Sequence, residues 1–163
     1  MSQYGFNFDK EKCIGCRACE VACQIWNDLA QTVRWRNVAT AMQGTYPQIT
    51  NANVSLACMH CGDAACKEAC PRTAISKDDE TGRVTVDQQR CVGCMLCLWA
   101  CPFAAPQLGV QGRMEKCTFC EDRPEGMKRA CEEICPTKAI VSGKVEDLIK
   151  ISEQGVMLGH ERG

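Results

Sequence analysis

Residues 91–102 decide the fold, and they read Cys91-Val92-Gly93-Cys94-Met95-Leu96-Cys97-Leu98-Trp99-Ala100-Cys101-Pro102. Protein loops bind iron–sulfur clusters through this spacing, C-x2-C-x2-C-x3-C-P. A [4Fe–4S] cube needs four thiolates at the corners of a tetrahedron, and seven consecutive residues in a tight loop supply three of them. The fourth cysteine follows on a short helical turn and points to a neighbouring cluster. The stretch therefore predicts a loop, a short helix and ligands for two clusters.

Cysteine is far more abundant in the whole chain than ordinary composition allows, at 16 of 163 residues. Three further groups of four carry the other twelve cysteines: Cys13-x2-Cys16-x2-Cys19-x3-Cys23, Cys58-x2-Cys61-x4-Cys66-x3-Cys70-Pro71 and Cys117-x2-Cys120-x10-Cys131-x3-Cys135-Pro136. The first of these lacks only the final proline of the 91–102 pattern. Sixteen thiolates in groups of four predict four [4Fe–4S] clusters.

Disulfide bonds and zinc sites are the competing reasons for so many cysteines. Disulfides need an oxidising compartment, and cysteines separated by two residues in one turn point to a common centre instead. Zinc ribbons usually show C-x2-C pairs that are about 15–20 residues apart. Here three of the four groups hold their first three cysteines within nine residues. The spacing therefore favours iron–sulfur clusters, and Gly15 and Gly93 suit loops that need unusual backbone angles.

Composition excludes several other functions. Lys and Arg number 19 and Asp and Glu 20, so a formal net charge of −1 gives no reason to expect a nucleic-acid partner. No run of about 18 apolar residues occurs, so we expect no direct membrane insertion. Residues 1–9 lack a basic and apolar leader, so we expect no export address and a cytoplasmic location. No G-x-G-x-x-G motif supports nicotinamide or flavin binding.

The segments between the cysteine groups predict an α+β fold of small β-hairpins and short helices around the clusters, with few long helices. Alternating apolar residues predict a strand over 4–9. Strand-like segments separated by turn residues predict a hairpin of 73–76 with 83–86 and another of 137–141 with 144–146. Apolar residues at helical spacing predict a helix over 145–152, and the absence of such spacing predicts an extended tail over 155–163. Each proline after a fourth cysteine is expected to end the short helix that carries it.

The repeated groups predict two bacterial 2[4Fe–4S] ferredoxin-like modules. Groups two and three would form an inner module over residues 58–101. Groups one and four would form an outer module from residues 1–23 and 102–144. Residues 24–57 would be a connecting insertion, and residues 145–163 a C-terminal helix and tail. Spacing alone equally allows group one to pair with group two, and group three with group four.

Several other side chains are candidates for a supporting role. Arg17, Lys67, Arg72, Arg90 and Lys116 lie beside cysteines, where they either offset the negative charge of a cluster or are ordinary exposed cations. His60 is a candidate to tune a cluster potential through a hydrogen bond. Trp99 is expected to pack over a cluster. The aromatic residues of the 24–57 insertion, Trp26, Trp35 and Tyr46, either pack over the clusters or form a partner-binding surface.

The four groups together resemble a known family. The resemblance covers about residues 4–141, and it is carried by Tyr4-Gly5-Phe6, by Cys13-Ile14-Gly15-Cys16-Arg17-Ala18-Cys19-Glu20-Val21-Ala22-Cys23, by Cys58-Met59-His60-Cys61 and by Lys116-Cys117-Thr118-Phe119-Cys120. The pattern is similar to the four-cluster ferredoxin subunit of molybdenum or tungsten pterin oxidoreductases, of the dimethyl sulfoxide reductase beta-subunit type, which serve anaerobic metabolism.

The resemblance implies that each cluster takes three cysteines from one group and one from another. The implied ligand sets are Cys13, Cys16, Cys19 and Cys135 for cluster 1, Cys23, Cys117, Cys120 and Cys131 for cluster 2, Cys58, Cys61, Cys66 and Cys101 for cluster 3, and Cys70, Cys91, Cys94 and Cys97 for cluster 4. All sixteen family positions are cysteine here. The resemblance therefore implies four [4Fe–4S] clusters and no three-iron cluster.

The resemblance also implies a function and partners. The chain is expected to relay single electrons to or from a pterin-metal catalytic subunit, to have no catalytic site of its own, and in some complexes to contact a further electron-input or electron-output subunit. The short chain favours the small subunit of a cytoplasmic tungsten enzyme of the aldehyde oxidoreductase family, including the class II benzoyl-CoA reductase type, with a molybdenum enzyme as the alternative. A free polyferredoxin that shuttles electrons between enzymes is the other hypothesis.

Overall fold

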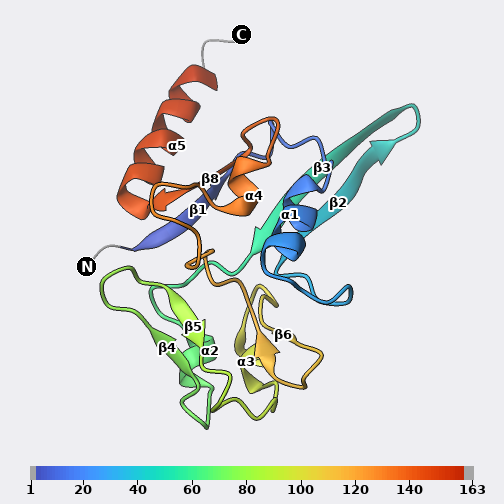
Figure 1. Ribbon diagram of the computed structural model, residues 1–163. Helices are drawn as coiled ribbons and strands as arrows, with labels where there is room; N and C mark the ends of the chain where they lie inside the picture. Colours follow the sequence, from blue (N-terminus) through green and yellow to red (C-terminus); the bar gives the residue numbers. More distant parts are fainter. Residues whose placement is uncertain (1–2, 160–163) are drawn as a thin grey trace.

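The structure, a computed structural model, describes residues 3–159, with side chains described through residue 152. Short helices and two-stranded antiparallel sheets make up the fold (Figure 1), which confirms the expected mixture of helix and strand. The elements in chain order are β1 (Tyr4–Phe8), α1 (Ala18–Trp26), β2 (Arg36–Thr45), β3 (Gln48–Ala57), α2 (Ala65–Glu68), β4 (Ile75–Lys77), β5 (Val84–Val86), α3 (Leu96–Ala100), β6 (Gln107–Leu108), β7 (Met114–Glu115), α4 (Ala130–Glu133), β8 (Ile140–Lys144) and α5 (Val145–Gly159).

The first and last strands pair with each other. β1 runs antiparallel to β8, with Tyr4 opposite Lys144 and Phe8 opposite Ile140. This pairing confirms the predicted N-terminal strand and brings the start of the chain to the residues that follow the fourth cysteine group. The expected hairpin of 137–141 with 144–146 is wrong. The Ser142-Gly143 pair suggested a turn, but the chain runs straight through it because Gly143 lies opposite Gly5 in the β1–β8 register.

Helix α5 begins immediately after β8. The predicted helix over 145–152 is confirmed, but the helix continues to Gly159. The expected extended tail is therefore wrong for residues 155–159. The rest of that predicted tail lies outside the described residues. Glu146 and Asp147 in the first turn favour the helix dipole. Leu148 is buried, and α5 packs against β1 and β8 with the Leu148 side chain near Gly143. This contact places α5 along β1 and β8.

The β4–β5 hairpin forms as the sequence predicts, with Ile75 opposite Val86. Ile75 and Val84 turn inward and pack with Ala64, Cys97 and Met114, so this core contains both apolar side chains and cysteine sulfurs. A second core joins Cys19, Val38, Cys131 and Ile140. Both small cores are therefore built around the cysteine-bearing helices.

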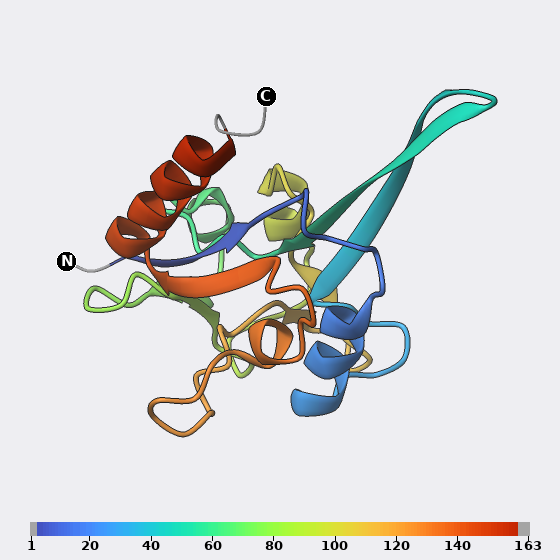
Figure 2. The ribbon, with the colours of Figure 1, turned by 90° about the horizontal axis from the view of Figure 1, so that it is seen from above.

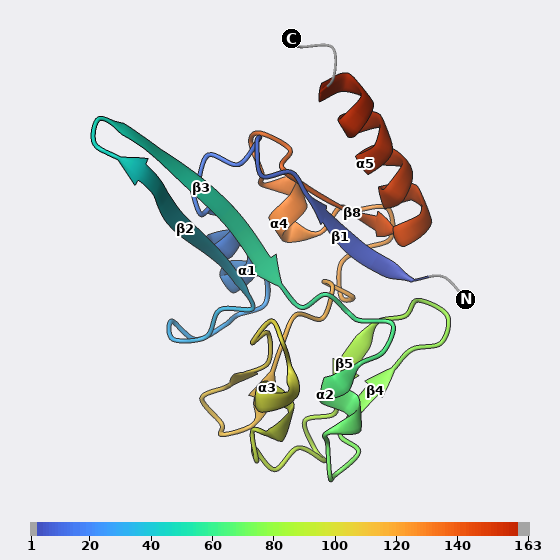
Figure 3. The ribbon, with the colours of Figure 1, turned by 180° about the vertical axis from the view of Figure 1, so that it is seen from behind.

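The longest sheet is a hairpin that the sequence did not predict. β2 and β3 pair from Arg36 opposite Ala57 to Thr45 opposite Gln48. Figures 2 and 3 show the hairpin tip extending away from the rest of the molecule, on the side opposite α5. Residues 41–51 are all exposed. The alternation of buried and exposed residues that normally marks a strand is absent there, because neither face of the tip packs on a core.

The short helices pack in pairs. α1 packs against α4, and α2 packs against α3. Figure 1 shows α4 beside β8, α1 between α4 and the β2–β3 hairpin, and α2 beside the β4–β5 hairpin. Each of α2, α3 and α4 ends before the proline that follows its cysteine group, as predicted, but the expectation that these helices carry the fourth cysteines is wrong, because Cys70, Cys101 and Cys135 lie just after the helix ends. The paired helices bring cysteines from different groups together.

Candidate functional site

The cysteines of the first group line a cavity with a cysteine from the fourth group. Cys13, Cys16, Cys19 and Cys135 surround this space, hereafter the Cys16 cavity. Phe8, Val38 and Ile140 also line it, from β1, β2 and β8. The pairing of β1 with β8 therefore places Cys135 opposite the loop that bears the other three thiols.

A second cavity collects the remaining cysteines of groups one and four. Cys23, Cys117, Cys120 and Cys131 line it, and it is hereafter the Cys120 cavity. Phe6, Asn27, Trp35 and Arg36 complete its wall. Helix α1 serves both cavities, since Cys19 faces the first and Cys23, one helical turn later, faces the second.

The cysteines of groups two and three form two further sets. Cys70, Cys91, Cys94 and Cys97 line the Cys94 cavity. The other four, hereafter the Cys61 set, are Cys58, Cys61, Cys66 and Cys101. Burial raises the pKa of Cys61 and of Cys66, and the negative charges of Cys58 and Cys101 raise both pKa values further. The packing of α2, which bears Cys66, against α3, which Cys101 follows, brings these two cysteines into the same region.

The loops that present these thiols depend on left-handed backbone angles. Gly15 and Gly93 have φ of +71° and +69°. A Cβ at Gly93 would lie 1.9 Å from the Gly112 carbonyl oxygen, so only glycine fits there. Arg17 and Met95 also have positive φ, at 60° and 62°, just before α1 and α3. These repeated turns wrap the first three cysteines of a group around its cavity.

Backbone amides point at several sulfurs. The N–H groups of residues 74, 114, 119 and 139 donate to Cys70, Cys91, Cys117 and Cys135 at donor–sulfur distances of 3.3, 3.2, 3.4 and 3.3 Å. Hydrogen bonds to thiolate sulfur stabilise its negative charge and tune a bound cluster. The donor set around each of these sulfurs therefore suits a thiolate ligand.

Several of the buried thiols are held in their protonated form when no metal is bound. Burial raises the pKa of Cys97 to about 11 and that of Cys117 to about 12, and it raises the pKa of Cys23 as well. Burial also acts to raise the pKa of Cys135, but hydrogen bonds from Thr137 and nearby amides outweigh it and lower the pKa overall. Iron must therefore displace protons when it binds, as is general for thiolate sites.

Two buried donors in the Cys120 cavity wall have no acceptor. Trp35 Nε1 and Arg36 Nη2 are buried and have no hydrogen-bond partner in the described part of the chain. Both residues line the cavity. A buried N–H without a partner is costly, so its presence points to an acceptor that the polypeptide does not supply. The sulfur atoms of a [4Fe–4S] cluster would be such acceptors, and the cavity wall therefore fits this cofactor.

Comparison with known proteins agrees with this chemistry. The 4Fe-4S dicluster domain family matches residues 49–145, and the 4Fe-4S binding domain family matches residues 6–25. The chain is 39% identical over 159 residues to the B subunit of anaerobic dimethyl sulfoxide reductase from Escherichia coli (strain K12), covering 91% of this chain and 77% of that protein. The chain belongs to this family of iron–sulfur subunits.

Two other members of the family serve different reductases and dehydrogenases. The thiosulfate reductase electron transfer subunit of Salmonella typhi is 38% identical, with 90% of this chain and 78% of that protein covered. The formate dehydrogenase iron-sulfur subunit of Wolinella succinogenes is 34% identical, with 93% and 86% covered. The present iron–sulfur subunit therefore carries four [4Fe–4S] clusters, transfers electrons and is not the catalytic subunit. None of its described helices is long and apolar enough to cross a membrane.

The predicted cations of this iron–sulfur subunit divide into two kinds. Lys116 is buried, and its ammonium donates to the carbonyl oxygens of Val84 and Cys117. Arg17, Lys67, Arg72 and Arg90 are exposed, which agrees with the interpretation of ordinary exposed cations. One cation of the five is therefore held inside the protein.

His60 and Trp99 lie in opposite environments. His60 is buried, its Nδ1 accepts a 3.0 Å hydrogen bond from the Val84 amide, and burial lowers its pKa to about 3. It is therefore a neutral imidazole fixed against β5. Trp99 is 82% exposed, so the expectation that it packs over a cluster is wrong. It lies on the solvent side of α3, whose buried side is occupied by Cys97.

The aromatic residues of the 24–57 insertion differ in their surroundings. Trp35 lines the Cys120 cavity, whereas Tyr46 at the hairpin tip is 88% exposed. Trp26 is 38% exposed, and its indole N–H donates a 2.9 Å hydrogen bond to Asp122. Trp35 therefore takes part in a cysteine site, whereas Tyr46 at the hairpin tip is exposed to solvent.

Sequence reasoning missed the polar residues that the insertion brings to the cysteines. Arg36 Nη1 donates to Ser55 Oγ at 3.0 Å, and that oxygen lies 3.6 Å from Cys19 Sγ. Asn53 Nδ2 donates to the Cys13 carbonyl oxygen at 3.1 Å. No spacing rule links these residues to the cysteines, since the hairpin returns β3 to the first loop only through tertiary contacts.

Proposed function

We propose that the four clusters occupy the four cysteine sets described above and form an electron relay to a pterin-metal catalytic subunit. Cluster 1 would bind in the Cys16 cavity, cluster 2 in the Cys120 cavity, cluster 3 at the Cys61 set and cluster 4 in the Cys94 cavity. The observation that carries the proposal is that three cavities are each lined by four cysteines, in the combinations that the resemblance implied.

We infer that the sets follow one another in a single row. Helix α1 and Cys131–Cys135 connect the first two sites, and α2 with α3 connects the last two. We infer that the middle link joins Cys117 to Cys58, because Phe119, two residues after Cys117, packs its ring 5.4 Å from that of His60, two residues after Cys58. The proposed order of the relay is therefore clusters 1, 2, 3 and 4.

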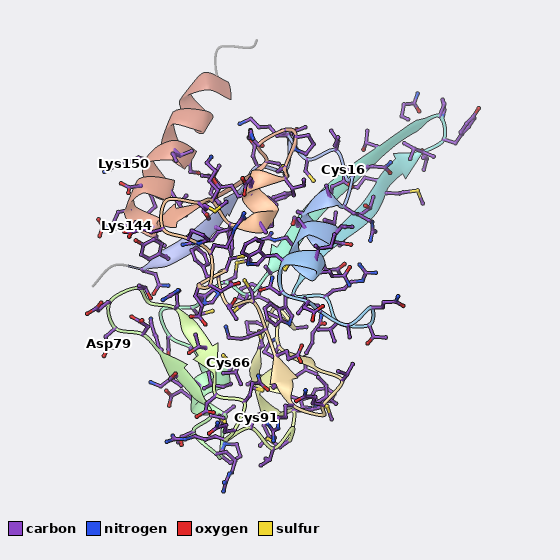
Figure 4. All side chains as sticks on the ribbon, in the orientation of Figure 1. Cys16, Cys66, Asp79, Cys91, Lys144 and Lys150 are labelled. Atoms are coloured by element: carbon purple, nitrogen blue, oxygen red, sulfur yellow. The ribbon has the colours of Figure 1, made fainter. Side chains whose placement is uncertain are left out.

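Both ends of this row reach solvent. Cys16 and Cys94 are exposed, and the other fourteen cysteines are buried or partly buried. Figure 4 labels Cys16 beside the β2–β3 hairpin, and Cys66 and Cys91 in the opposite part of the molecule. Solvent access at a terminal cluster suits exchange of electrons with a partner. We propose that the catalytic subunit contacts one end, and a further electron-input or electron-output subunit the other.

The same contacts support the two-module division. Packing of α1 on α4 and pairing of β1 with β8 support an outer module of residues 1–23 and 102–144. Packing of α2 on α3 supports an inner module of residues 58–101. Residues 24–57 and 145–163 would then be the insertion and the C-terminal extension. These contacts favour pairing of groups one and four over pairing of groups one and two.

The relatives favour one catalytic partner over another. They are named as subunits of dimethyl sulfoxide reductase, thiosulfate reductase and formate dehydrogenase. These names support a catalytic subunit of the dimethyl sulfoxide reductase type, with molybdenum or tungsten, over the aldehyde oxidoreductase type that the sequence favoured. Metal analysis of the purified complex distinguishes molybdenum from tungsten. Location in the cytoplasm stays a prediction, which cell fractionation tests.

Anaerobic co-purification tests the proposed role. The tagged chain is expected to retain a larger subunit that contains molybdenum or tungsten. Recovery of the chain as a monomer at native concentration would contradict the subunit role and favour the free polyferredoxin.

Cysteine variants test the proposed ligand sets. Cys135→Ser and Cys16→Ser are expected to alter the same EPR signal, because both thiols line one cavity. Cys70→Ser and Cys94→Ser are expected to alter a second signal and leave the first unchanged. Coupling of Cys16 with Cys70 instead would show that groups one and two are paired.

A further inference from the structure

Arg36, the first residue of β2, is a buried cation without a carboxylate partner among the described residues. It is 3% exposed. Its guanidinium lies 4.6 Å above the centre of the Phe6 ring, and Nη1 donates to Ser55. Nη2 has no partner in the described part of the chain. Burial of an unpaired charge is strongly unfavourable, so this cation requires a compensating negative charge nearby.

Arg36 shares the wall of the Cys120 cavity with the potential thiolates Cys23, Cys117 and Cys131. Four thiolates on an oxidised [4Fe–4S] core carry two net negative charges. The proposed cluster 2 therefore provides the counter-charge that the polypeptide lacks.

Two neutral donors belong to the same wall. Trp35 Nε1 is buried and unpartnered in the described chain, and Asn27 Nδ2 lies 3.7 Å from Cys23 Sγ. The Asn27 amide also donates to the Cys23 carbonyl oxygen at 2.8 Å, which fixes its position. One buried cation and two neutral N–H donors therefore lie at the Cys120 cavity. His60 Nε2 is also buried and unpartnered in the described chain, but it belongs to a neutral imidazole between Cys58 and Cys61.

The cations near the other sites act differently. Arg17 beside the Cys16 cavity and Arg72 beside the Cys94 cavity are exposed, so water and salt screen their charge. Lys116, near the Cys61 set, is buried but directs its ammonium at two backbone carbonyl oxygens. Arg36 alone among these cations combines burial with an N–H that has no acceptor within the described protein.

We propose that Arg36, assisted by Trp35 and Asn27, raises the reduction potential of the cluster in the Cys120 cavity. The proposal rests on the proposed assignment of cluster 2 to that cavity. Reduction adds one electron to the cluster and takes its net charge from −2 to −3, with no bond made or broken. A buried cation and N–H···S bonds stabilise the more negative state. Arg36 is thus a positioning residue that sets where a transferred electron is held.

Redox titration of the full complex, followed by EPR, tests this role. The cluster 2 signal is identified first by its loss in Cys120→Ser. Arg36→Met removes the charge at similar volume, and we expect at least about a tenfold fall in the equilibrium constant for reduction of cluster 2, equal to about 59 mV for one electron. Arg36→Lys keeps the charge and is expected to retain most of the potential. The exposed Arg90→Met is the control and is expected to leave the cluster 2 potential unchanged.

The outcomes separate this inference from the proposed function. An unchanged cluster 2 potential in an Arg36→Met protein with full iron content would overturn the role of Arg36. If Arg36→Met does not retain the cluster, the cluster 2 potential is measured in Trp35→Phe instead, because this variant removes one N–H without removing a charge. A smaller fall in potential supports the proposal, and no change overturns it. Retention of every signal in Cys120→Ser would instead overturn the assignment of cluster 2 to this cavity.

Discussion

Glu20 links helix α1 to the base of the hairpin through a buried carboxylate. It accepts a hydrogen bond from the Val38 amide and lies 3.3 Å from Arg34 Nη1 and 3.6 Å from Arg17 Nη1. Both arginines are about half exposed, so they retain water when the carboxylate is removed. The Val38 amide is buried, so it gains no water in place of the lost carboxylate. The contribution of Glu20 to stability therefore comes mainly from the amide that it satisfies.

Replacement of Glu20 by Ala is expected to destabilise the protein by about 1–3 kcal/mol, the cost of an unsatisfied buried N–H. Because Cys19 is the neighbour of Glu20 on α1, the iron of the Cys16 cavity should be lost first during anaerobic denaturation, which EPR of the cluster 1 signal follows. Glu11→Ala, at an exposed carboxylate, is the control. Equal stability of the two variants would show that the Val38 contact has no effect.

At the residue scale, local spacing predicted the thiols but not their polar neighbours. The first three cysteines of each of the first three groups lie in one loop or helix, so the sequence alone brings them close together. Arg36 and Ser55 reach Cys19 and the Cys120 cavity because β2 and β3 fold back over α1. A single arginine in a polar segment ordinarily indicates an exposed side chain. Its burial depends on tertiary contacts that no local pattern records.

At the scale of elements, helix α5 and strand β8 show how a turn signal can mislead. Ser142-Gly143 is a common turn pair, but β8 continues through it because β1 supplies a partner strand. The Val145 amide then donates to the Gln3 carbonyl oxygen at 2.8 Å, which extends this contact to the start of α5. Long-range pairing therefore outweighed the local preference.

Leu148 anchors α5 to the β1–β8 sheet, so Leu148→Ala is expected to destabilise the docked helix by about 2–5 kcal/mol. Hydrogen exchange should accelerate across α5 and β8, while the β4–β5 hairpin stays protected. Ile149→Ala changes the adjacent exposed residue and is expected to have little effect. The same exchange rates in both variants would contradict the docking of α5 through Leu148.

At the scale of the whole molecule, Phe119 joins the elements around the first and fourth groups to those around the second. Its fully buried ring lies 4.7 Å from that of Phe6 on β1 and 5.4 Å from that of His60 in the second cysteine group. Arg129 stacks on it at 4.5 Å. The residue between Cys117 and Cys120 therefore packs at the point where the two halves of the proposed relay meet.

Phe119→Ala is expected to cost about 3–5 kcal/mol, because it leaves a cavity at this junction. The denaturant concentration at which the visible absorbance of the clusters is lost should fall markedly. Phe103→Ala, at a partly exposed phenylalanine, is the control. If both variants lose their clusters at the same denaturant concentration, the Phe119 contacts do not hold the two halves together.

The cofactor content and family of the molecule were predictable, whereas its outline was not. Sixteen cysteines in four groups predicted four clusters, because thiolate number and spacing are set by cluster chemistry. The projecting β2–β3 hairpin was not predicted, because its exposed tip lacks the pattern that burial imposes on a strand. The function of the protein could therefore be predicted from its sequence more fully than its shape could.

Iron and sulfide analysis of the anaerobically purified chain, combined with low-temperature EPR of the reduced protein, tests the central claim most directly. Four [4Fe–4S] clusters predict about sixteen iron and about sixteen acid-labile sulfide per chain, with signals of interacting reduced clusters. A colourless protein that contains zinc in place of iron and gives no EPR signal on reduction would contradict the account.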